Sequence, residues 1–119
     1  MRIGIVGSRK IIDAQIVEDI VNNLSPMDVV VSGGCKGPDT YAEDRAIAIG
    51  LKTTIHKPDL DGITDRGDMI NRYYERNRRV VQDCDLLIAF VNKDRKGGTE
   101  NTIMWAKKLG VRHIIIEEK

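Results

Sequence analysis

The stretch VVVSGGCKGPDTYAEDRA, residues 29–46, runs from three successive valines through a glycine-rich turn into a segment where alanine alternates with charge. Continuous β-branched residues are typical of a strand that is covered on both faces of a parallel sheet. In the segment that follows, Ala42, Ala46 and Ile49 fall on one face of a helix. The stretch therefore predicts a buried strand followed directly by a helix, which is the repeating unit of an α/β fold.

The same alternation of strand and helix extends over the whole chain. Apolar runs recur at 2–6, 28–32, 51–56, 86–91 and 112–116, and apolar residues at helical spacing occupy 16–24. Strands that alternate with helices imply right-handed crossovers and a parallel sheet. We therefore predict a single Rossmann-like domain over 1–119, with a five-stranded parallel sheet and helices on both faces.

Composition excludes several classes of protein. The chain has 19 basic and 18 acidic residues and a net charge of +1, so no global field attracts nucleic acid or a membrane surface. Its two cysteines, Cys35 and Cys84, form no CxxC pair, and its histidines, His56 and His113, have no metal-ligand spacing. We expect a cytoplasmic protein without a metal or resident cofactor, in which Cys35 is a small filler of its turn and not a nucleophile.

Four turns follow the predicted strands at their carboxyl ends. They are GSRK at 7–10, SGGCKGPD at 32–39, the long irregular segment 57–67, and NKDRKGGTEN at 92–101. In doubly wound folds the ligand lies beyond the carboxyl ends of the strands. We therefore expect these turns to converge on one crevice.

The turn at 32–39 has two interpretations. Gly33, Gly34 and Gly37 permit backbone conformations that are closed to other residues and let a ligand approach the main chain. Free N–H groups at the start of the next helix then suit an anion such as phosphate. The alternative is a tight turn in which Thr40 and Glu43 form a capping box.

The first and last turns carry similar groups. Ser8 offers a hydroxyl and Arg9 a bidentate fork for phosphate, unless Ser8 only caps a helix and Arg9 is solvated. Gly98 and Thr99 stand at the predicted start of another helix. Three turns of this kind at corresponding positions favour a phosphate-type ligand.

Arginines are concentrated in the segment 66–79, which contains five of them. Arg72, Arg76 and Arg79 share one face at helical spacing. Such a face is solvated, or directs a cation into the crevice, or forms a weak nucleic-acid surface with the neighbouring tyrosines.

Together these motifs resemble the SLOG superfamily, the Rossmann-like group that includes the LOG proteins and the DNA-processing protein A family. The resemblance is carried by residues 7–10, 32–46, 76–77 and 83–110, and it is greatest to the small stand-alone YspA-like branch. It implies a pocket for a nucleotide-derived ligand, such as an ADP-ribose-like or NAD-related molecule. The ligand-binding residues implied by position are Gly7, Ser8, Arg9, Gly33, Gly34, Gly37, Asp39, Arg76, Asn77, Gly98, Thr99 and Asn101.

The sequence departs from the superfamily's hydrolases at the residues that would carry catalysis. LOG phosphoribohydrolases have a PGGxGTxxE pattern, whereas here Gly-Thr is followed at once by Glu100. One residue is a rotation of about 100° on a helix, so we expect Glu100 to face away from the pocket and Asn101 to face into it. Asp39 and Glu43 are the other candidate catalytic carboxylates.

Three functions follow from the resemblance. The first is a sensor or carrier that binds the nucleotide-derived ligand without turning it over. The second is an N-glycosidic-bond enzyme, either a LOG-like nucleoside monophosphate phosphoribohydrolase or similar to the nucleoside deoxyribosyltransferases, which needs a carboxylate against the sugar. The third is single-stranded DNA binding, as in DNA-processing protein A. Pairing through helices, as in related proteins, leaves a homo-oligomer open.

Overall fold

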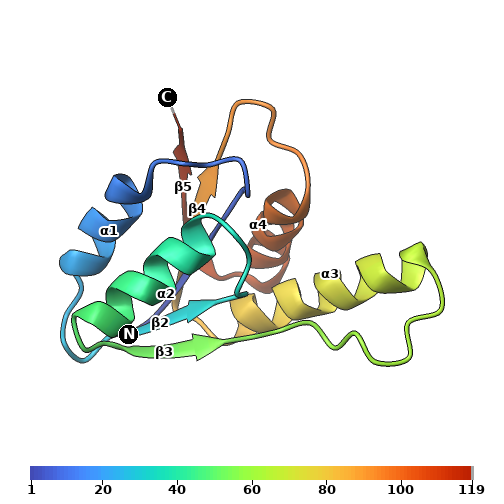
Figure 1. Cartoon of the computed structure of the whole chain (residues 1–119), viewed down its shortest axis with the longest axis horizontal. Helices are drawn as coiled ribbons and strands as arrows, with labels where there is room; N and C mark the ends of the chain where they lie inside the picture. The colour runs from blue at the N-terminus through green and yellow to red at the C-terminus, as the bar shows by residue number, and fades with distance from the viewer. Residues whose placement is uncertain (119) are drawn as a thin grey trace.

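The computed structural model describes residues 1–118 and shows five strands and four helices in alternation (Figure 1). The strands are β1 (Arg2–Gly7), β2 (Val29–Ser32), β3 (Lys52–Ile55), β4 (Leu86–Val91) and β5 (Arg112–Glu117). The helices are α1 (Ala14–Asn22), α2 (Pro38–Ala48), α3 (Arg66–Gln82) and α4 (Gly98–Leu109). The predicted strands are confirmed, and each differs from its predicted range by at most one residue at either end.

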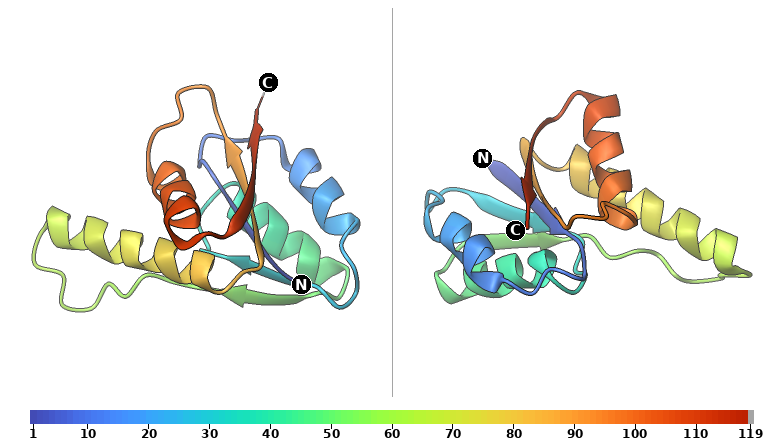
Figure 2. Two further views of the ribbon diagram at one scale, coloured as in Figure 1. Left: turned by 180° about the vertical axis from the view of Figure 1, so that it is seen from behind. Right: turned by 90° about the horizontal axis from the view of Figure 1, so that it is seen from above.

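The five strands form one parallel sheet in the order β3-β2-β1-β4-β5. Helices α1 and α2 lie together on one face, and α3 and α4 lie together on the other (Figures 1 and 2). The chain runs outward from β1 to β3, and α3 then carries it back across the sheet to β4. The carboxyl ends of β1 and β4 are therefore adjacent, and the turns that follow them face each other at the point where the strand order reverses. The predicted fold, a single Rossmann-like domain with helices on both faces, is confirmed.

Each face of the sheet has its own apolar core. Beneath α1 and α2 the buried residues include Ile5, Val17 and Phe90, and beneath α3 and α4 they include Val31 and Leu87. Strands β1, β2 and β4 contribute to both layers because successive side chains point to opposite faces. This explains why their sequences are continuously apolar and not alternating.

The segment between β3 and α3 is shorter than the sequence indicates. Asp65 is the N-cap of α3, and its carboxylate accepts a hydrogen bond from the Asp68 N–H at 2.8 Å. The irregular segment therefore ends at 65 and not at 67, because the cap satisfies an N–H group in the first turn. The long loop and the first turns of α3 project beyond the sheet (Figure 1).

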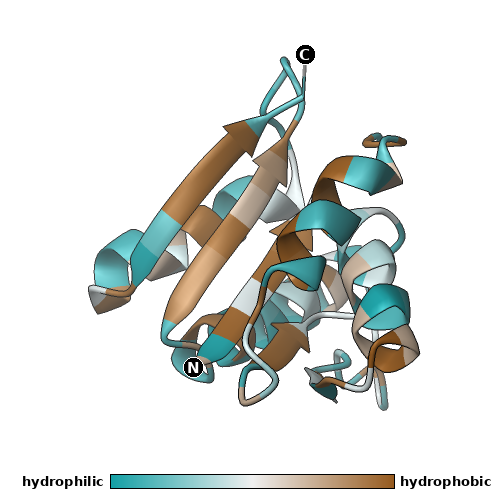
Figure 3. Ribbon diagram, turned by 90° about the vertical axis from the view of Figure 1, so that its left-hand side faces the viewer, coloured by the Kyte–Doolittle hydropathy of each residue, from teal (hydrophilic) through white to brown (hydrophobic). Residues whose placement is uncertain are grey.

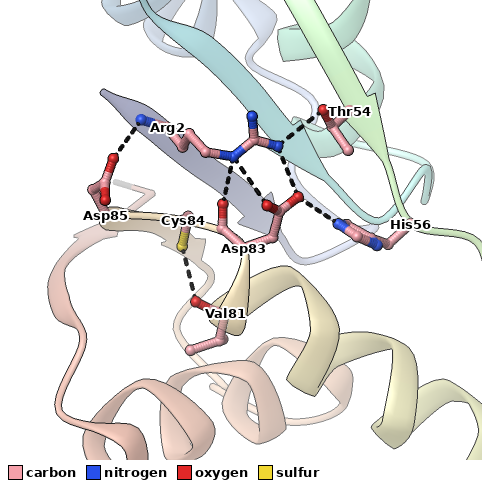
Figure 4. A network of polar contacts seen from close by, with 7 residues as sticks. All are labelled: Arg2, Thr54, His56, Val81, Asp83, Cys84 and Asp85. Carbon is pink, nitrogen blue, oxygen red and sulfur yellow. Dashed lines mark hydrogen bonds and ion pairs between the residues drawn. The ribbon is translucent and has the colours of Figure 1, made fainter.

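A polar network fixes the carboxyl end of α3 against the sheet (Figure 4). The Asp83 carboxylate accepts hydrogen bonds from Arg2 Nε at 2.9 Å and Nη2 at 2.8 Å, and it lies 2.7 Å from His56 Nε2. Arg2 Nη2 also donates to the Thr54 hydroxyl at 3.1 Å. These contacts join β1, β3 and α3, so His56 has a structural partner in the fold.

The two edges of the sheet differ in character. Strand β3 has four residues, KTTI, whereas β5 has six, RHIIIE, with three consecutive isoleucines. Figure 3 shows β5 at the open edge with a hydrophobic centre between hydrophilic ends, and α1 and α2 do not extend over it. Among residues 1–118, no helix is long and apolar enough to cross a membrane.

Candidate functional site

The predicted crevice is present at the carboxyl ends of β1, β2 and β4. It contains a cavity of about 330 Å³, here called the inner cavity. Its lining residues are Val6, Gly7, Ser8, Arg9, Lys10, Gly33, Cys35, Asp39, Arg76, Asn77, Val80, Lys96, Gly97, Gly98, Thr99 and Thr102. Three of the four predicted turns and helix α3 thus meet at one place, and most of the predicted ligand-binding residues line it.

Arg76 is a buried cation in the wall of the inner cavity. It is 5% exposed, and its guanidinium donates to the Gly33 carbonyl, to the Asn77 side-chain oxygen at 3.0 Å and to Cys35 Sγ at 3.2 Å. A guanidinium has five N–H groups, so two remain for a ligand. Within residues 1–118 no carboxylate forms an ion pair with Arg76. Since buried charges are normally paired, the arrangement favours an anion in the cavity.

Asp39 joins the first two turns. Its carboxyl oxygens accept hydrogen bonds from the Gly7 N–H at 3.2 Å and the Gly33 N–H at 2.9 Å. Burial raises the pKa of Asp39 to about 7, although the Gly33 N–H and the Arg76 guanidinium act to lower it. Near neutral pH this carboxyl is therefore partly protonated, which reduces its repulsion of an anion beside it.

The helices α2 and α4 both begin at the inner cavity. Their N-caps are Gly37 and Gly97, and neither has a side chain that caps the helix. The capping box of Thr40 and Glu43 is wrong, because α2 already begins at Pro38 and the Thr40 hydroxyl donates to the Cys35 carbonyl at 2.6 Å. Uncapped first turns present N–H groups and the positive end of the helix dipole to an anion, and α4 offers more donors than α2 because Pro38 has no N–H.

Three further cations line the inner cavity. Lys10 forms an ion pair with Asp94 at 2.9 Å, whereas Arg9 and Lys96 have no ion-pair partner among the described residues. Together with Arg76 they give four cationic side chains against the single carboxyl of Asp39. The cavity is therefore positive although the protein as a whole is nearly neutral.

Two of the predicted glycines make room for groups of the protein itself. A Cβ at Gly7 would lie 2.3 Å from Pro38 Cγ, so Gly7 lets α2 pack directly against β1. A Cβ at Gly33 would lie 3.0 Å from the Arg76 guanidinium, so Gly33 lets that group lie against the turn. Gly34 and Gly37 do not line the inner cavity, and both have positive φ, 73° and 93°. They shape the turn that carries Gly33.

The candidate catalytic carboxylates are dispersed. Glu100 pairs with Arg95, with Nε at 2.6 Å, and does not line the inner cavity. Glu43 lies behind the turn and accepts a hydrogen bond from Ser32, and burial raises its pKa despite that bond. The prediction that Asn101 faces into the pocket is wrong. Asn101 does not line the cavity, because it accepts a hydrogen bond from Asn77 at 3.2 Å and so orients that side chain. Of the three carboxylates only Asp39 reaches the cavity.

A second cavity of about 440 Å³, the outer cavity, continues the crevice toward β3. It shares Arg9, Gly33, Cys35 and Arg76 with the inner cavity. Its other lining residues are Gly34, Lys36, Lys57, Pro58, Leu60 and Tyr73.

The apolar wall of the outer cavity escapes prediction from the sequence. Pro58 and Leu60 lie in the irregular segment 57–65, which carries no periodicity. Tyr73 could have been identified from its position on α3, one turn before Arg76, whose guanidinium lies 5.5 Å from the tyrosine ring centroid. Among the described residues no group of three or more His, Cys, Asp or Glu side chains could hold a metal ion.

Comparison with known proteins gives one solved structure of similar fold. DNA processing protein A from Streptococcus pneumoniae superposes with a TM-score of 0.80 at 24% sequence identity. The match covers 99% of this chain and 50% of that one, so the chain spans about half the length of its structural neighbour. No family model and no curated protein matches the chain. The likeness shows the fold.

Proposed function

We propose that the protein binds a nucleotide-derived ligand, with its phosphate groups in the inner cavity, and acts as a sensor or carrier. The observation that carries this proposal is Arg76, a buried guanidinium that has no carboxylate partner among residues 1–118 and lies beside two uncapped helix N-termini. Phosphate suits this site because it accepts hydrogen bonds from several N–H groups at once and its negative charge neutralises the buried cation. The proposal includes membership of the YspA-like branch of the SLOG superfamily, which rests on the motifs at 7–10, 32–46 and 83–110.

The outer cavity offers a place for the nucleoside. Tyr73 and Leu60 provide an aromatic and an aliphatic surface, and Arg76 lies between the two cavities. A ligand with phosphates at one end and a base at the other would occupy both. ADP-ribose and related diphosphates have this shape.

Calorimetric titration with ADP-ribose, AMP and adenosine tests the proposal. We expect ADP-ribose to bind and adenosine to bind far more weakly, because the buried cation recognises phosphate. Replacing Lys96 with alanine should weaken the binding of ADP-ribose roughly tenfold, because a charged contact to phosphate is lost. Lys107→Ala is the matched control, because Lys107 lies at the far end of α4 and is exposed. Equal binding of adenosine and ADP-ribose would refute the phosphate site.

Hydrolysis of an N-glycosidic bond has less support from the geometry. Glu100 forms an ion pair and Glu43 accepts a hydrogen bond within the protein, and Asp39 accepts hydrogen bonds from two main-chain N–H groups. We therefore expect no adenine release from AMP above that of an Asp39→Asn variant. Adenine release that is lost in Asp39→Asn would instead favour the enzyme.

Single-stranded DNA is the second candidate ligand, favoured by the likeness to a DNA processing protein. Lys36 and Lys57 border the outer cavity and extend the positive surface along one side of the crevice. Phosphate-driven DNA binding falls steeply with salt. Salt-dependent binding of an oligonucleotide that ADP-ribose does not displace would favour DNA over the small ligand.

A further inference from the structure

Strand β5 leaves an unprotected edge on the sheet. Long apolar edge strands invite pairing with another chain, and proteins usually shorten, charge or cover them. The opposite edge, β3, is short and begins with Lys52 followed by two threonines. Strand β5 has no such protection over Ile114, Ile115 and Ile116, and Ile114 is 48% exposed.

The free hydrogen-bonding groups of β5 belong to its odd-numbered residues. The Glu118 N–H donates to the Val91 carbonyl on the neighbouring strand at 2.8 Å. Because the N–H and carbonyl groups alternate between the two sides of a strand, those of His113, Ile115 and Glu117 point outward. A second strand can therefore hydrogen-bond along this edge.

The charges of β5 complement each other in one antiparallel register. If Ile115 pairs with its own copy across a two-fold axis, Arg112 faces Glu118 of the second copy and His113 faces Glu117. Residues that face each other in this register share a parity and so lie on the same face of the sheet. The centre of the pair is formed by isoleucines on both faces.

Two further features at the same edge also suggest a missing partner: an unpaired polar atom and an open apolar groove. One carboxylate oxygen of Glu118, Oε2, is buried without a hydrogen-bond partner among the described residues. A groove of about 630 Å³ runs beside β5, and Ile12, Ile16 and Ile116 line part of it. Ile12 is 84% exposed although it lies next to this groove.

We propose that the protein forms a two-fold dimer through β5, in which two sheets join into one continuous ten-stranded sheet with Ile115 at the axis. The occupant of the edge is a second copy of the chain, because RHIIIEE is complementary in charge to itself when reversed. About six main-chain hydrogen bonds form across the axis. The apolar grooves of the two copies then lie side by side on the face of the joined sheet that carries α1 and α2.

Sedimentation velocity over roughly 1 to 200 µM tests the dimer. We expect a species of twice the 13.4 kDa chain mass. Arg112→Glu and Glu118→Arg should each weaken dimerisation at least about tenfold, because each places like charges opposite one another twice. The double variant restores opposite charges and should dimerise nearly as well as the wild type. Lys52→Glu, the same kind of change at the start of the other edge strand, is the matched control and should have no effect.

Hydrogen exchange provides an independent readout. The Ile115 N–H points outward, so we expect its exchange to slow as the protein concentration rises. A wild-type protein that stays monomeric, or that assembles without limit, overturns the proposal. A dimer that survives both single charge reversals also overturns it. Ile70→Asp changes an exposed isoleucine in the projecting part of α3, and a dimer that is lost only in this variant would place the interface on the helices instead.

Discussion

Replacing Asp39 with asparagine tests the central electrostatic feature of the site. Asparagine has the same shape, but it has one acceptor oxygen where the carboxyl group has two. It can accept from the Gly7 N–H or the Gly33 N–H but not from both. The other N–H then faces an amide NH₂ group, and an unsatisfied buried donor costs about 1–3 kcal/mol. We therefore expect Asp39→Asn to fold with reduced stability near pH 4, where the wild-type carboxyl group is protonated.

The dependence of this loss on pH follows from the raised pKa of the buried carboxyl. Its pKa is about 7 in the folded protein and 3.8 ordinarily. Between these values the native state keeps a proton that the unfolded chain has released, so the free energy of unfolding falls as the pH rises. At about 1.4 kcal/mol for each pH unit, Asp39 removes about 4 kcal/mol between pH 4 and pH 7. Asparagine does not titrate, so wild type loses this amount relative to the variant as the pH rises. Asp39→Asn should therefore be less stable than wild type near pH 4 and as stable as wild type, or more stable, near pH 7.

Urea denaturation of both proteins at several pH values measures this difference. Subtracting the two curves cancels the titration of every other group that the substitution leaves unchanged. Asp61→Asn is the matched control, because Asp61 is an exposed carboxylate in the loop before α3 and its loss should leave the pH dependence unaltered. A difference between wild type and Asp39→Asn that stays constant or grows as the pH rises would refute the reasoning, because Asp39 would then be stabilised as the anion.

Two further predictions concern stability. Gly7→Ala should lower the free energy of unfolding by about 2 kcal/mol and Tm by roughly ten degrees, because its Cβ would clash with Pro38. Gly98→Ala is the control, because a Cβ there would lie 3.9 Å from Asn77 Nδ2. A Tm of Gly7→Ala as close to wild type as that of Gly98→Ala would contradict this prediction. Burial acts to raise the pKa of Asp83, but hydrogen bonds from Arg2 and His56 outweigh it and lower the pKa overall. Asp83→Asn should therefore lower Tm at pH 7 by roughly five degrees. The difference in Tm should vanish when the pH falls through the folded-state pKa of Asp83. An undiminished difference at about pH 2.5 would show that the charge of Asp83 is not the cause.

The sequence by itself determined the sheet and the place of the site. Continuous apolar runs such as 29–31 and 86–91 can be covered only on both faces, and the helical stripes between them require crossovers. Parallel strands bring their carboxyl ends to one edge, so the convergence of the turns at 7–10, 32–39 and 92–101 followed without coordinates. The helix register also predicted that Glu100 lies outside the cavity, but the same rotation wrongly placed Asn101 inside it, because Asn77 and not Asn101 lines the cavity.

Tertiary structure decided which protein group meets each of these residues. The sequence places Arg76 on a helical face with Arg72 and Arg79, but only packing brings it beneath Gly33, 43 residues away. In the part of the chain that the structure describes, that packing gives it no carboxylate partner. In the same way Asp39 turned out to join two turns, and Gly7 to receive Pro38. Periodicity fixes the face on which a side chain lies, because it depends on local backbone geometry. The partner across that face depends on strand order and on the distance between elements far apart in the chain, and these are set only when the whole domain packs.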